Sequence, residues 1–463
     1  MNLPRRQLFC VAAALLIVCS VARAGEGTNL LPPLDLRADS PEAKGWRLWT
    51  PRAELALPGE IVGTGGGAAL LLTAERFEQY GKWIARVGPV EPGAYYRLEV
   101  TRQAKDITAE NVSVFVLVAW YGGTENGDAL IYQDVVHGER DEDKGRRHFR
   151  TVRAPAGAKW VDVELGLRWT EGGSVRWSQA SLTQVAPPAP RKVRVATTQL
   201  RPQENPTVAT NTKLVADLID RAGPERPDVL LFSEAFPSRA VKGPLRERAQ
   251  TVPGPFTEML SEKARKYGLN IIAGLVERAG DHVYNSAVWI DRTGRIAGKY
   301  RKVHLTIGEA DKGLTPGSDY PVFDTDFGRM GILICWDNWF SEPARIMRLQ
   351  GAELLFVPLA ADGQEVHWDA ISRARAIDNG LYLVTSGTWF DGQSVVMSPT
   401  GEVLGQAEPD AGYVITEVDL DAEYRIKYMG EGEVRFIHER RPDTYRMLTE
   451  GRDHQLAPVP ARE

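Results

Sequence analysis

A short proline-rich segment, Ala186-Pro187-Pro188-Ala189-Pro190, divides the chain into two parts with different periodicities. Proline fixes the backbone φ angle and favours an extended, stiff linker. The chain has 463 residues, which is too long for one ordinary domain. We therefore predict two domains, at residues 25–185 and 192–445, with a linker at 186–191 and a C-terminal tail at 446–463.

The first part reads as short strands between Gly, Pro and Asp turns, without a helical period. Val112–Trp120, Trp160–Leu167 and Val175–Val185 have the apolar runs or alternation of strands. Together they predict an all-β sandwich. A Pro-Gly-x-Tyr-Tyr entry to one strand and a closing Gly-x-Val-x-Trp strand at residues 173–177 resemble the jelly-roll sandwiches of carbohydrate-binding modules and galactose-binding-like domains.

This resemblance makes a saccharide a candidate ligand of the sandwich. Aromatic side chains offer flat apolar faces to sugar rings, and they equally fill the cores of sandwiches. Both interpretations stay open for the aromatic residues of this part, which are Trp46, Trp49, Trp83, Trp120, Tyr121, Trp169 and Trp177.

Residues 1–24 have the composition of a cleaved export signal. Arg5 and Arg6 precede an apolar run, Leu8–Val18, that is too short to span a bilayer, and Ala22-Arg23-Ala24 has the small-x-small pattern of a cleavage site. We therefore expect an exported protein, periplasmic or secreted. No later stretch is long and apolar enough to predict a membrane span.

The cysteine count becomes informative once the signal is removed. Cys10 and Cys19 lie within the predicted signal, so Cys335 is the single cysteine of the predicted mature chain. One cysteine cannot form an internal disulfide. Because an exposed thiol oxidises readily, either burial or function has to explain its presence.

Charge and residue spacing argue against several classes of partner. Removing Arg5, Arg6 and Arg23 with the signal changes the formal net charge from −5 to −8. An acidic chain without a Lys/Arg cluster argues against nucleic acid and anionic membranes. No His/Glu pair has the spacing of a metallohydrolase site, so we expect no metal and no cofactor.

After the linker, predicted strands alternate with predicted helices, and several strands form antiparallel pairs. This alternation is typical of an α/β domain. We expect strands at 193–200, 228–232, 270–276, 283–290, 331–334, 354–357, 382–386 and 394–397, and helices at 207–222, 256–267, 342–350 and 367–379.

Three ionisable side chains stand at or near the ends of these strands: Glu234, Lys302 and Cys335. Ligands of α/β sheets usually bind at the carboxyl ends of strands. A cysteine with a pKa of about 8.5 is a poor nucleophile at neutral pH and needs a base or a cation nearby. A carboxylate and a lysine at neighbouring strand ends are the groups that this chemistry needs.

The motifs around these residues are similar to those of the nitrilase superfamily of carbon–nitrogen hydrolases. The similarity covers about residues 192–421. The matching segments are Leu230–Glu234 for the glutamate motif, Lys299–Leu305 for the lysine motif, Gly331–Asp337 for the cysteine motif, Glu309 with Pro316-Gly317 for the second glutamate, and Arg373–Asn379 for the late helix.

The resemblance implies a four-layer α-β-β-α sandwich, here preceded by the jelly-roll domain. It also implies pairing into homodimers, or a higher homo-oligomer, through outer helices and residues 424–447. It implies an amidase-type enzyme in which Cys335 is the nucleophile and Glu234 the general base. Lys302 and the Trp336 backbone N–H would stabilise the oxyanion. Glu309 would either orient the water of the second step or fix Lys302.

Trp336, Asp337 and Asn338 follow the nucleophile, and we expect them to bind substrate. Family amidases carry aspartate at position 337 and true nitrilases carry glutamate, so the resemblance favours a small amide over a nitrile. An N-carbamoyl compound stays open. Ser341 stands where the family usually has proline, which leaves the path of this loop open.

The sequence also bears on two other classes of protein. A cysteine–histidine protease would need His282, His304 or His367 as its base, and no protease signature surrounds Cys335. A non-catalytic saccharide-binding or scaffold protein is the alternative from a different class. The presence of all three of Glu234, Lys302 and Cys335 argues against it.

Overall fold

The computed structural model describes the sandwich, the α/β region and part of the C-terminal segment. The predicted signal lies outside the described residues, as does most of the predicted tail. The described residues are 27–33, 45–64, 67–124, 127–360, 365–388, 393–408, 412–422, 424–427, 431–433, 437 and 439–449.

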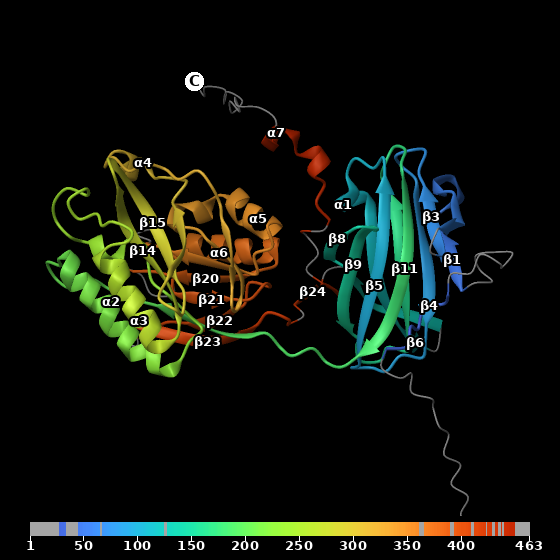
Figure 1. Cartoon of the computed structure of the whole chain (residues 1–463), viewed down its shortest axis with the longest axis horizontal. Coiled ribbons are helices and arrows are strands. Elements are labelled where there is room, and N and C mark those ends of the chain that lie inside the picture. The colour runs from blue at the N-terminus through green and yellow to red at the C-terminus, as the bar shows by residue number, and fades with distance from the viewer. Residues whose placement is uncertain are drawn as a thin grey trace, which may run out of the picture.

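The N-terminal part is a sandwich of two antiparallel sheets (Figure 1). The first sheet has the order β1 (Trp46–Trp49), β4 (Tyr80–Val87), β10 (Trp160–Arg168), β6 (Val114–Thr124) and β7 (Gly127–Val135). The second sheet has the order β2 (Gly59–Thr64), β3 (Gly67–Thr73), β11 (Ser174–Val185), β5 (Tyr95–Lys105), β9 (Gly145–Arg153) and β8 (Gly138–Glu142).

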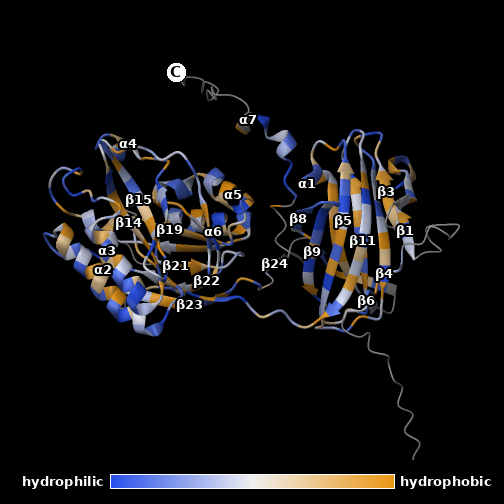
Figure 2. Cartoon of the chain, in the orientation of Figure 1, coloured by the Kyte–Doolittle hydropathy of each residue, from blue (hydrophilic) through white to orange (hydrophobic). Residues whose placement is uncertain are grey.

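The inward faces of these sheets form the core of the sandwich. Hydrophobic and hydrophilic residues alternate along its strands, as Figure 2 shows, because successive side chains of a strand point to opposite faces. Trp46, Trp83, Trp120 and Trp177 are fully buried in this core. These four residues are therefore core residues and not surfaces for sugar, whereas Trp49, Tyr121 and Trp169 remain partly exposed.

One predicted strand begins later than expected. Val112 and Ser113 belong to a short helix, α1 (Glu110–Ser113), and the strand β6 starts at Val114. The backbone N–H groups of both residues donate to the carbonyl of Ala109, which curls the chain before the strand. Val112 and Val114 stand two residues apart, as apolar residues of a strand do, so periodicity alone did not show the turn.

The C-terminal part contains two further six-stranded sheets. One has the order β16 (Ile296–Arg301), β15 (His282–Ile290), β14 (Asn270–Ala279), β13 (Val229–Leu231), β12 (Lys192–Thr198) and β23 (Tyr413–Asp419). The other has the order β17 (Val322–Thr325), β18 (Gly328–Ile332), β19 (Leu354–Pro358), β20 (Tyr382–Ser386), β21 (Val395–Met397) and β22 (Val403–Gln406).

Helices cover the outer faces of these two sheets. α2 (Val208–Ala222) and α3 (Pro255–Tyr267) pack on the first sheet, and α5 (Ser341–Leu349) and α6 (Glu365–Asn379) pack on the second. Strand residues of both sheets meet in one hydrophobic core between them. The predicted four-layer α/β sandwich, preceded by an all-β sandwich, is confirmed.

The remaining elements lie in the C-terminal segment and at the edge of the α/β sandwich. α4 (Ile307–Ala310) follows β16, while β24 (Arg425–Lys427), β25 (Glu431–Glu433) and α7 (Arg446–Thr449) come last. Strand β11 ends at Val185 and β12 begins at Lys192. The exact limits of the domains stay a prediction, with these element boundaries on either side of the proline-rich linker.

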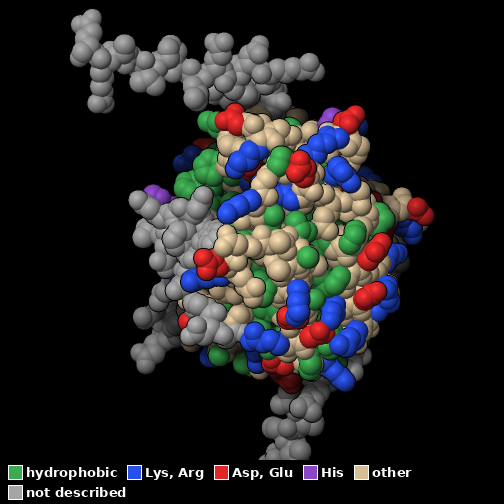
Figure 3. Space-filling view, turned by 90° about the vertical axis from the view of Figure 1, so that its left-hand side faces the viewer, with side chains coloured by type: hydrophobic (Ala, Val, Ile, Leu, Met, Phe, Trp, Pro, Cys, Tyr) green, Lys and Arg blue, Asp and Glu red, His purple; other side chains and the backbone are tan. Residues whose placement is uncertain are grey.

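On the face that Figure 3 shows, Lys and Arg side chains lie interspersed with Asp and Glu side chains. This face therefore presents no broad field of one sign. Within the described ranges, no helix combines the length and the apolar character that crossing a membrane requires.

Candidate active site

The three predicted reactive residues lie just beyond the ends of strands in the two α/β sheets. Glu234 follows β13, Lys302 directly follows β16, and Cys335 follows β18 after two buried residues. β13 pairs in parallel with β12 and β14, and β18 pairs in parallel with β19. Glu234 and Cys335 thus stand at carboxyl ends of parallel strands, where α/β sheets place their ligands.

Cys335 has a backbone conformation that few residues other than glycine adopt. Its φ angle is 46°, and it opens a 3₁₀ turn, Cys335–Trp339. A left-handed residue of this kind costs about 1–3 kcal/mol and needs its surroundings to hold it. The turn leads from a fully buried strand end to Cys335, a residue of intermediate overall exposure.

Lys302 lies between two carboxylates and forms an ion pair with each of them. Its Nζ atom is 2.9 Å from Oε1 of Glu234 and 2.9 Å from both carboxylate oxygens of Glu309. Lys302 is 1% exposed and Glu234 is 4% exposed. A charge buried this deeply needs a paired and hydrogen-bonded partner, and each of the three charges has one.

Glu309 is fixed at the start of α4 by a capping box. Its Oε2 atom accepts hydrogen bonds from the backbone N–H of Thr306 at 2.9 Å and from the Thr306 hydroxyl at 3.1 Å. In return, the Thr306 hydroxyl accepts from the Glu309 backbone N–H. Both carboxylate oxygens of Glu309 are therefore engaged with the protein.

Asn285, a residue that sequence reasoning missed, joins the two glutamates directly. From β15, its Nδ2 atom donates to Oε1 of Glu234 at 2.7 Å and to Oε1 of Glu309 at 2.8 Å. The side chain is 4% exposed. Its signal in the sequence is a polar residue on the same face of a strand as Ala287 and Trp289, both of which are buried.

Charges set the protonation states in this cluster. Burial opposes ionisation of Glu234, but Lys302 and Arg239 outweigh it and lower the pKa of the carboxyl. Burial likewise opposes the charge of Lys302, while Glu234, Cys335 and Glu309 raise the pKa of the ammonium above its usual value. Burial and Glu234 raise the pKa of the Cys335 thiol to about 12, against the opposing effect of Lys302.

These directions mean that the resting thiol is protonated beside an ionised carboxylate at neutral pH. The cysteine therefore needs a neighbouring base to remove its proton before it can attack. Glu234 is the carboxylate in that position, and its negative charge is one cause of the raised pKa of the Cys335 thiol.

Asp337 and Asn338 are fully buried, and their side chains contact protein groups. Asp337 accepts hydrogen bonds from the Tyr300 hydroxyl at 2.8 Å, the His304 backbone N–H at 2.8 Å and the Ile334 backbone N–H at 3.1 Å. This arrangement does not support direct substrate contact by Asp337. It instead joins the loop after Cys335 to the strand that carries Lys302.

Asn338 makes a similar internal contact. Its Nδ2 atom donates to the Ser372 hydroxyl of α6 at 3.3 Å, and its backbone carbonyl accepts from the Arg375 Nε–H at 3.1 Å. Trp336 is the one of the three predicted substrate-binding residues that is partly exposed. Its ring lies 5.0 Å from that of Trp339 and 6.1 Å from that of Phe340, which gives the Cys335 turn an aromatic surface.

The structure thus brings Glu234, Lys302 and Glu309 into one hydrogen-bonded cluster with Cys335 beside it. A positioned base, a buried cation and a thiol beside them can perform acyl transfer by a covalent route.

Comparison with known proteins gives the family. The sequence profile of the carbon–nitrogen hydrolase family matches residues 194–428. A probable nitrilase of Schizosaccharomyces pombe is 38% identical over 212 residues, which cover 42% of this chain and 75% of the yeast protein. The omega-amidase of Homo sapiens is 30% identical over 255 residues, which cover 51% of this chain and 91% of the human protein.

Two other similar proteins are amidases by name. The N-carbamoylputrescine amidase of Solanum lycopersicum is 32% identical over 274 residues, covering 52% of this chain and 90% of the tomato protein. The crystal structure of an amidase from Nesterenkonia sp. superposes with a TM-score of 0.48 at 24% identity, covering 55% of this chain and 96% of that protein.

The matches define a class of enzyme, a hydrolase that acts on carbon–nitrogen bonds other than peptide bonds. The chain belongs to the carbon–nitrogen hydrolase family, the nitrilase superfamily. The matched residues begin after the proline-rich linker, so the family membership describes the α/β part and not the sandwich.

Replacing Asn285 tests the role of the shared hydrogen bonds. Asn285→Ala removes a donor to both carboxylates, and hydrogen bonds to charged groups are worth about 1.5–3 kcal/mol. We expect kcat/KM to fall by roughly 10- to 100-fold. The matched control is Ser286→Ala, because this neighbour bonds Glu277 on the other face of the strand. Steady-state kinetics showing an unchanged Asn285→Ala enzyme would contradict this role.

Proposed function

We propose that the protein is an exported, thiol-dependent amidase in which Cys335, Glu234 and Lys302 carry out the reaction. The observation that supports it is the buried cluster of Lys302 with Glu234 and Glu309 beside the partly exposed Cys335. A merely structural cysteine would not need a buried base and a buried cation next to it.

In the first half of the reaction, Glu234 takes the proton from the Cys335 thiol, and the thiolate adds to the carbonyl carbon of the amide. Lys302 Nζ and the backbone N–H of Trp336 stabilise the oxyanion that forms. The tetrahedral intermediate collapses, the C–N bond breaks, and the proton held by Glu234 passes to the leaving amine or ammonia. A thioester on Cys335 remains.

In the second half, Glu234 takes a proton from water, and the resulting hydroxide adds to the thioester carbonyl. The second tetrahedral intermediate breaks its C–S bond, the carboxylic acid leaves, and the proton returns to the cysteine sulfur. The overall reaction consumes one water and yields one acid and one amine.

For Glu309, the geometry supports the role of fixing Lys302. Its two oxygens already accept hydrogen bonds from Lys302, Asn285 and the Thr306 turn. Orienting the attacking water would require one of these bonds to lengthen. We therefore place Glu309 among the groups that orient the lysine.

Two relatives bear names that support an amide as the substrate, namely omega-amidase and N-carbamoylputrescine amidase. A small amide is therefore the first substrate class to test. An N-carbamoyl compound or a nitrile would use the same nucleophile and base, and the probable nitrilase of fission yeast keeps the nitrile in the panel.

We include export in the proposal because residues 1–24 have the composition of a cleaved export signal. A cleaved signal would leave a mature chain that begins at Gly25, and N-terminal sequencing of protein recovered from outside the cytoplasm tests this directly. Pairing into a homodimer through the outer helices and residues 424–447 stays a prediction from the family resemblance.

The reaction is tested with purified mature protein and its Cys335→Ala variant. We expect ammonia release from at least one member of a panel of small amides, N-carbamoyl compounds and nitriles. The variant should lose essentially all of it, because no thioester can form. Ammonia release that persists in Cys335→Ala would contradict the proposed mechanism.

We further propose that the sandwich binds a saccharide on the outward face of its first sheet. Trp49 and Tyr80 lie edge to face there with ring centroids 5.7 Å apart, and Lys82 lies 4.6 Å above the Trp49 ring. Lys82 also pairs with Glu164 at 2.5 Å.

A second ion pair lies further along the same face. Arg86 pairs with Asp162 at 2.7 Å, and its guanidinium lies 4.9 Å from the ring centroid of Tyr121. In the strand register these side chains point away from the sandwich core, whereas Trp83 and Ala85 point into it. The partly exposed rings offer stacking surfaces to a sugar, and the Arg86 side chain, which is 42% exposed, offers hydrogen-bond donors. Asp162 and Glu164 are each 1% exposed, and they hold the two cations in place.

Retention on insoluble polysaccharides tests this second proposal. We expect the protein to bind at least one of a cellulose, chitin or peptidoglycan resin, and Trp49→Ala to weaken binding by roughly 3- to 10-fold through lost stacking. Leu448→Ala, at an exposed position in α7, is the control and should bind as the parent does. Absence of retention on every resin would contradict the proposal.

A further inference from the structure

Arg239 places a second cation beside Glu234. Its Nη2 atom lies 3.6 Å from Oε2 of Glu234 and donates to the Glu234 backbone carbonyl at 2.9 Å. We propose that Arg239 is a positioning residue that keeps the Glu234 carboxylate ionised and oriented for proton transfer from Cys335. This inference rests on the proposed function, because it gives Glu234 the role of base.

The charges around Glu234 do not balance without Arg239. Glu234 and Glu309 are two carboxylates that share one ammonium, that of Lys302. Asn285 is neutral, and the Cys335 thiol is neutral until it loses its proton. Arg239 adds the positive charge that brings this set to zero, and an opposite charge at such a distance favours the ionised carboxyl.

Arg239 and Lys302 have different roles in the proposed reaction. Lys302 has to stabilise the oxyanion, and its interaction with the carboxylates is then shared with a new negative charge. Arg239 approaches Glu234 from the loop after β13, whereas Lys302 approaches it from the end of β16. The arginine can therefore stabilise the ionised base before the attack and keep Glu234 oriented while the lysine contacts the substrate.

The fold positions the Arg239 loop with several buried hydrogen bonds. Asn211 of α2 is fully buried, and its Nδ2 atom donates to the carbonyls of Phe236, Pro237 and Arg239 at 3.2, 3.3 and 2.8 Å. Ala235, the residue after the base, has a left-handed φ of 49° that starts this turn. The loop is thus defined by the same helix that covers the sheet of Glu234.

Arg248 completes this support, although it lies close to Arg239. Its Nη1 atom donates to the carbonyls of Ser238, at 3.2 Å, and Val241, and the Ser238 hydroxyl donates to the Arg248 carbonyl at 3.0 Å. Burial, together with repulsion from Arg239, lowers the pKa of Arg248. The fold holds two like charges together here, and the Glu234 carboxylate is what compensates Arg239.

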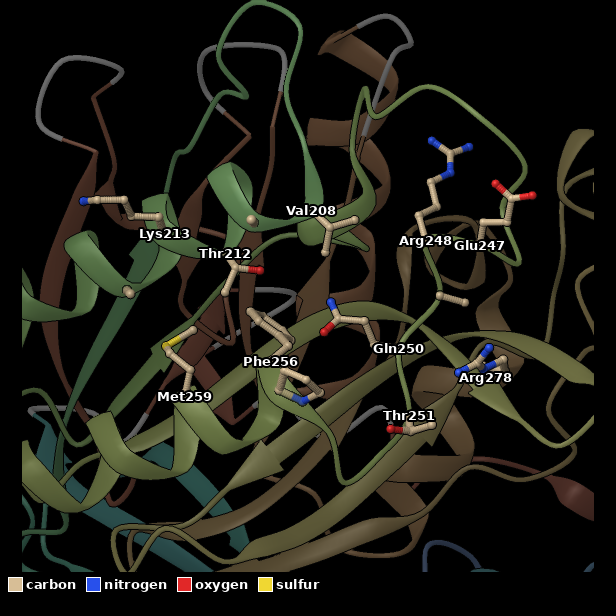
Figure 4. A pocket seen from close by; sticks show the side chains of 14 residues that line it. Val208, Thr212, Lys213, Glu247, Arg248, Gln250, Thr251, Phe256, Met259 and Arg278 are labelled. Carbon is tan, nitrogen blue, oxygen red and sulfur yellow. The ribbon is translucent and has the colours of Figure 1, made fainter.

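Arg248 borders a surface groove, but its hydrogen bonds stabilise the Arg239 loop. That groove, of about 700 Å³ between α2 and α3, is lined by Phe256 and Met259 among others. Figure 4 shows the Arg248 guanidinium pointing away from both of these side chains. Its hydrogen bonds lead instead to residues 238 and 241 of the Arg239 loop.

The consequence is a defined change in pH dependence. Glu234 must be ionised to accept the thiol proton, so activity is lost as the pH falls through the pKa of Glu234. Because Arg239 lowers the pKa of Glu234, removing this charge raises it. The acid limb of the pH profile should then move to higher pH, with less change on the plateau.

The experiment compares the parent with Arg239→Gln and Arg239→Lys. Two profiles are measured against pH: kcat/KM for the best amide, and the rate at which iodoacetamide alkylates Cys335. We expect the acid limb of both to rise by about one pH unit in Arg239→Gln, and by less in Arg239→Lys, which keeps the charge. Lys213→Gln removes an exposed charge from α2 and should leave both limbs unchanged.

The outcomes separate this inference from the proposed function. Hydrolysis that depends on Cys335 together with an unmoved acid limb in folded Arg239→Gln would overturn the role of Arg239 alone. If Arg239→Gln does not fold, the Arg239→Lys variant decides. A rate that falls by the same factor at every pH, without any shift of the acid limb, would also overturn the role of Arg239. If no amide in the panel is turned over, the alkylation profile still decides the question.

Discussion

The interaction on which this site depends is the buried pairing of Lys302 with Glu234 and Glu309. Removing one partner of a buried ion pair costs about 3–5 kcal/mol, because an uncompensated charge remains. The three residues come from different parts of one sheet and from the helix α4, so the cluster also defines where these elements meet. Asn285 and the Thr306 capping turn fix its geometry.

The second sheet contributes Cys335, the proposed nucleophile, and Asp337 joins the Cys335 turn to this cluster. The Asp337 carboxylate accepts hydrogen bonds from Tyr300 and His304, which flank Lys302 in the sequence, and from Ile334, which precedes Cys335. One buried carboxylate therefore fixes the lysine strand relative to the cysteine turn. The left-handed backbone of Cys335 is stabilised within this arrangement, which is how a strained residue persists at a reactive position.

The sequence located most strands of the α/β part, although β18 is Gly328–Ile332 and not 331–334, and β16 before Lys302 was not among the predicted strands. Alternation of apolar runs with turn residues predicted an α/β domain, and the family resemblance implied its arrangement in two sheets. Parallel strands bring Glu234 and Cys335 to carboxyl ends. Asn285 was not predicted, because its two hydrogen bonds depend on how β15, the β13 loop and α4 meet. Asp337 was expected to bind substrate because it is a polar residue close to Cys335. The structure instead buries Asp337 and places its partner Tyr300 on another strand.

The central claim is that Cys335 forms a covalent acyl intermediate beside an ionised Glu234. The most direct measurement is acid quenching of the protein during turnover of a slowly hydrolysed amide, followed by peptide mass spectrometry. The account predicts a mass increase equal to the acyl group on the peptide that contains Cys335. Turnover of the amide with an unmodified Cys335 peptide at every quench time would contradict it.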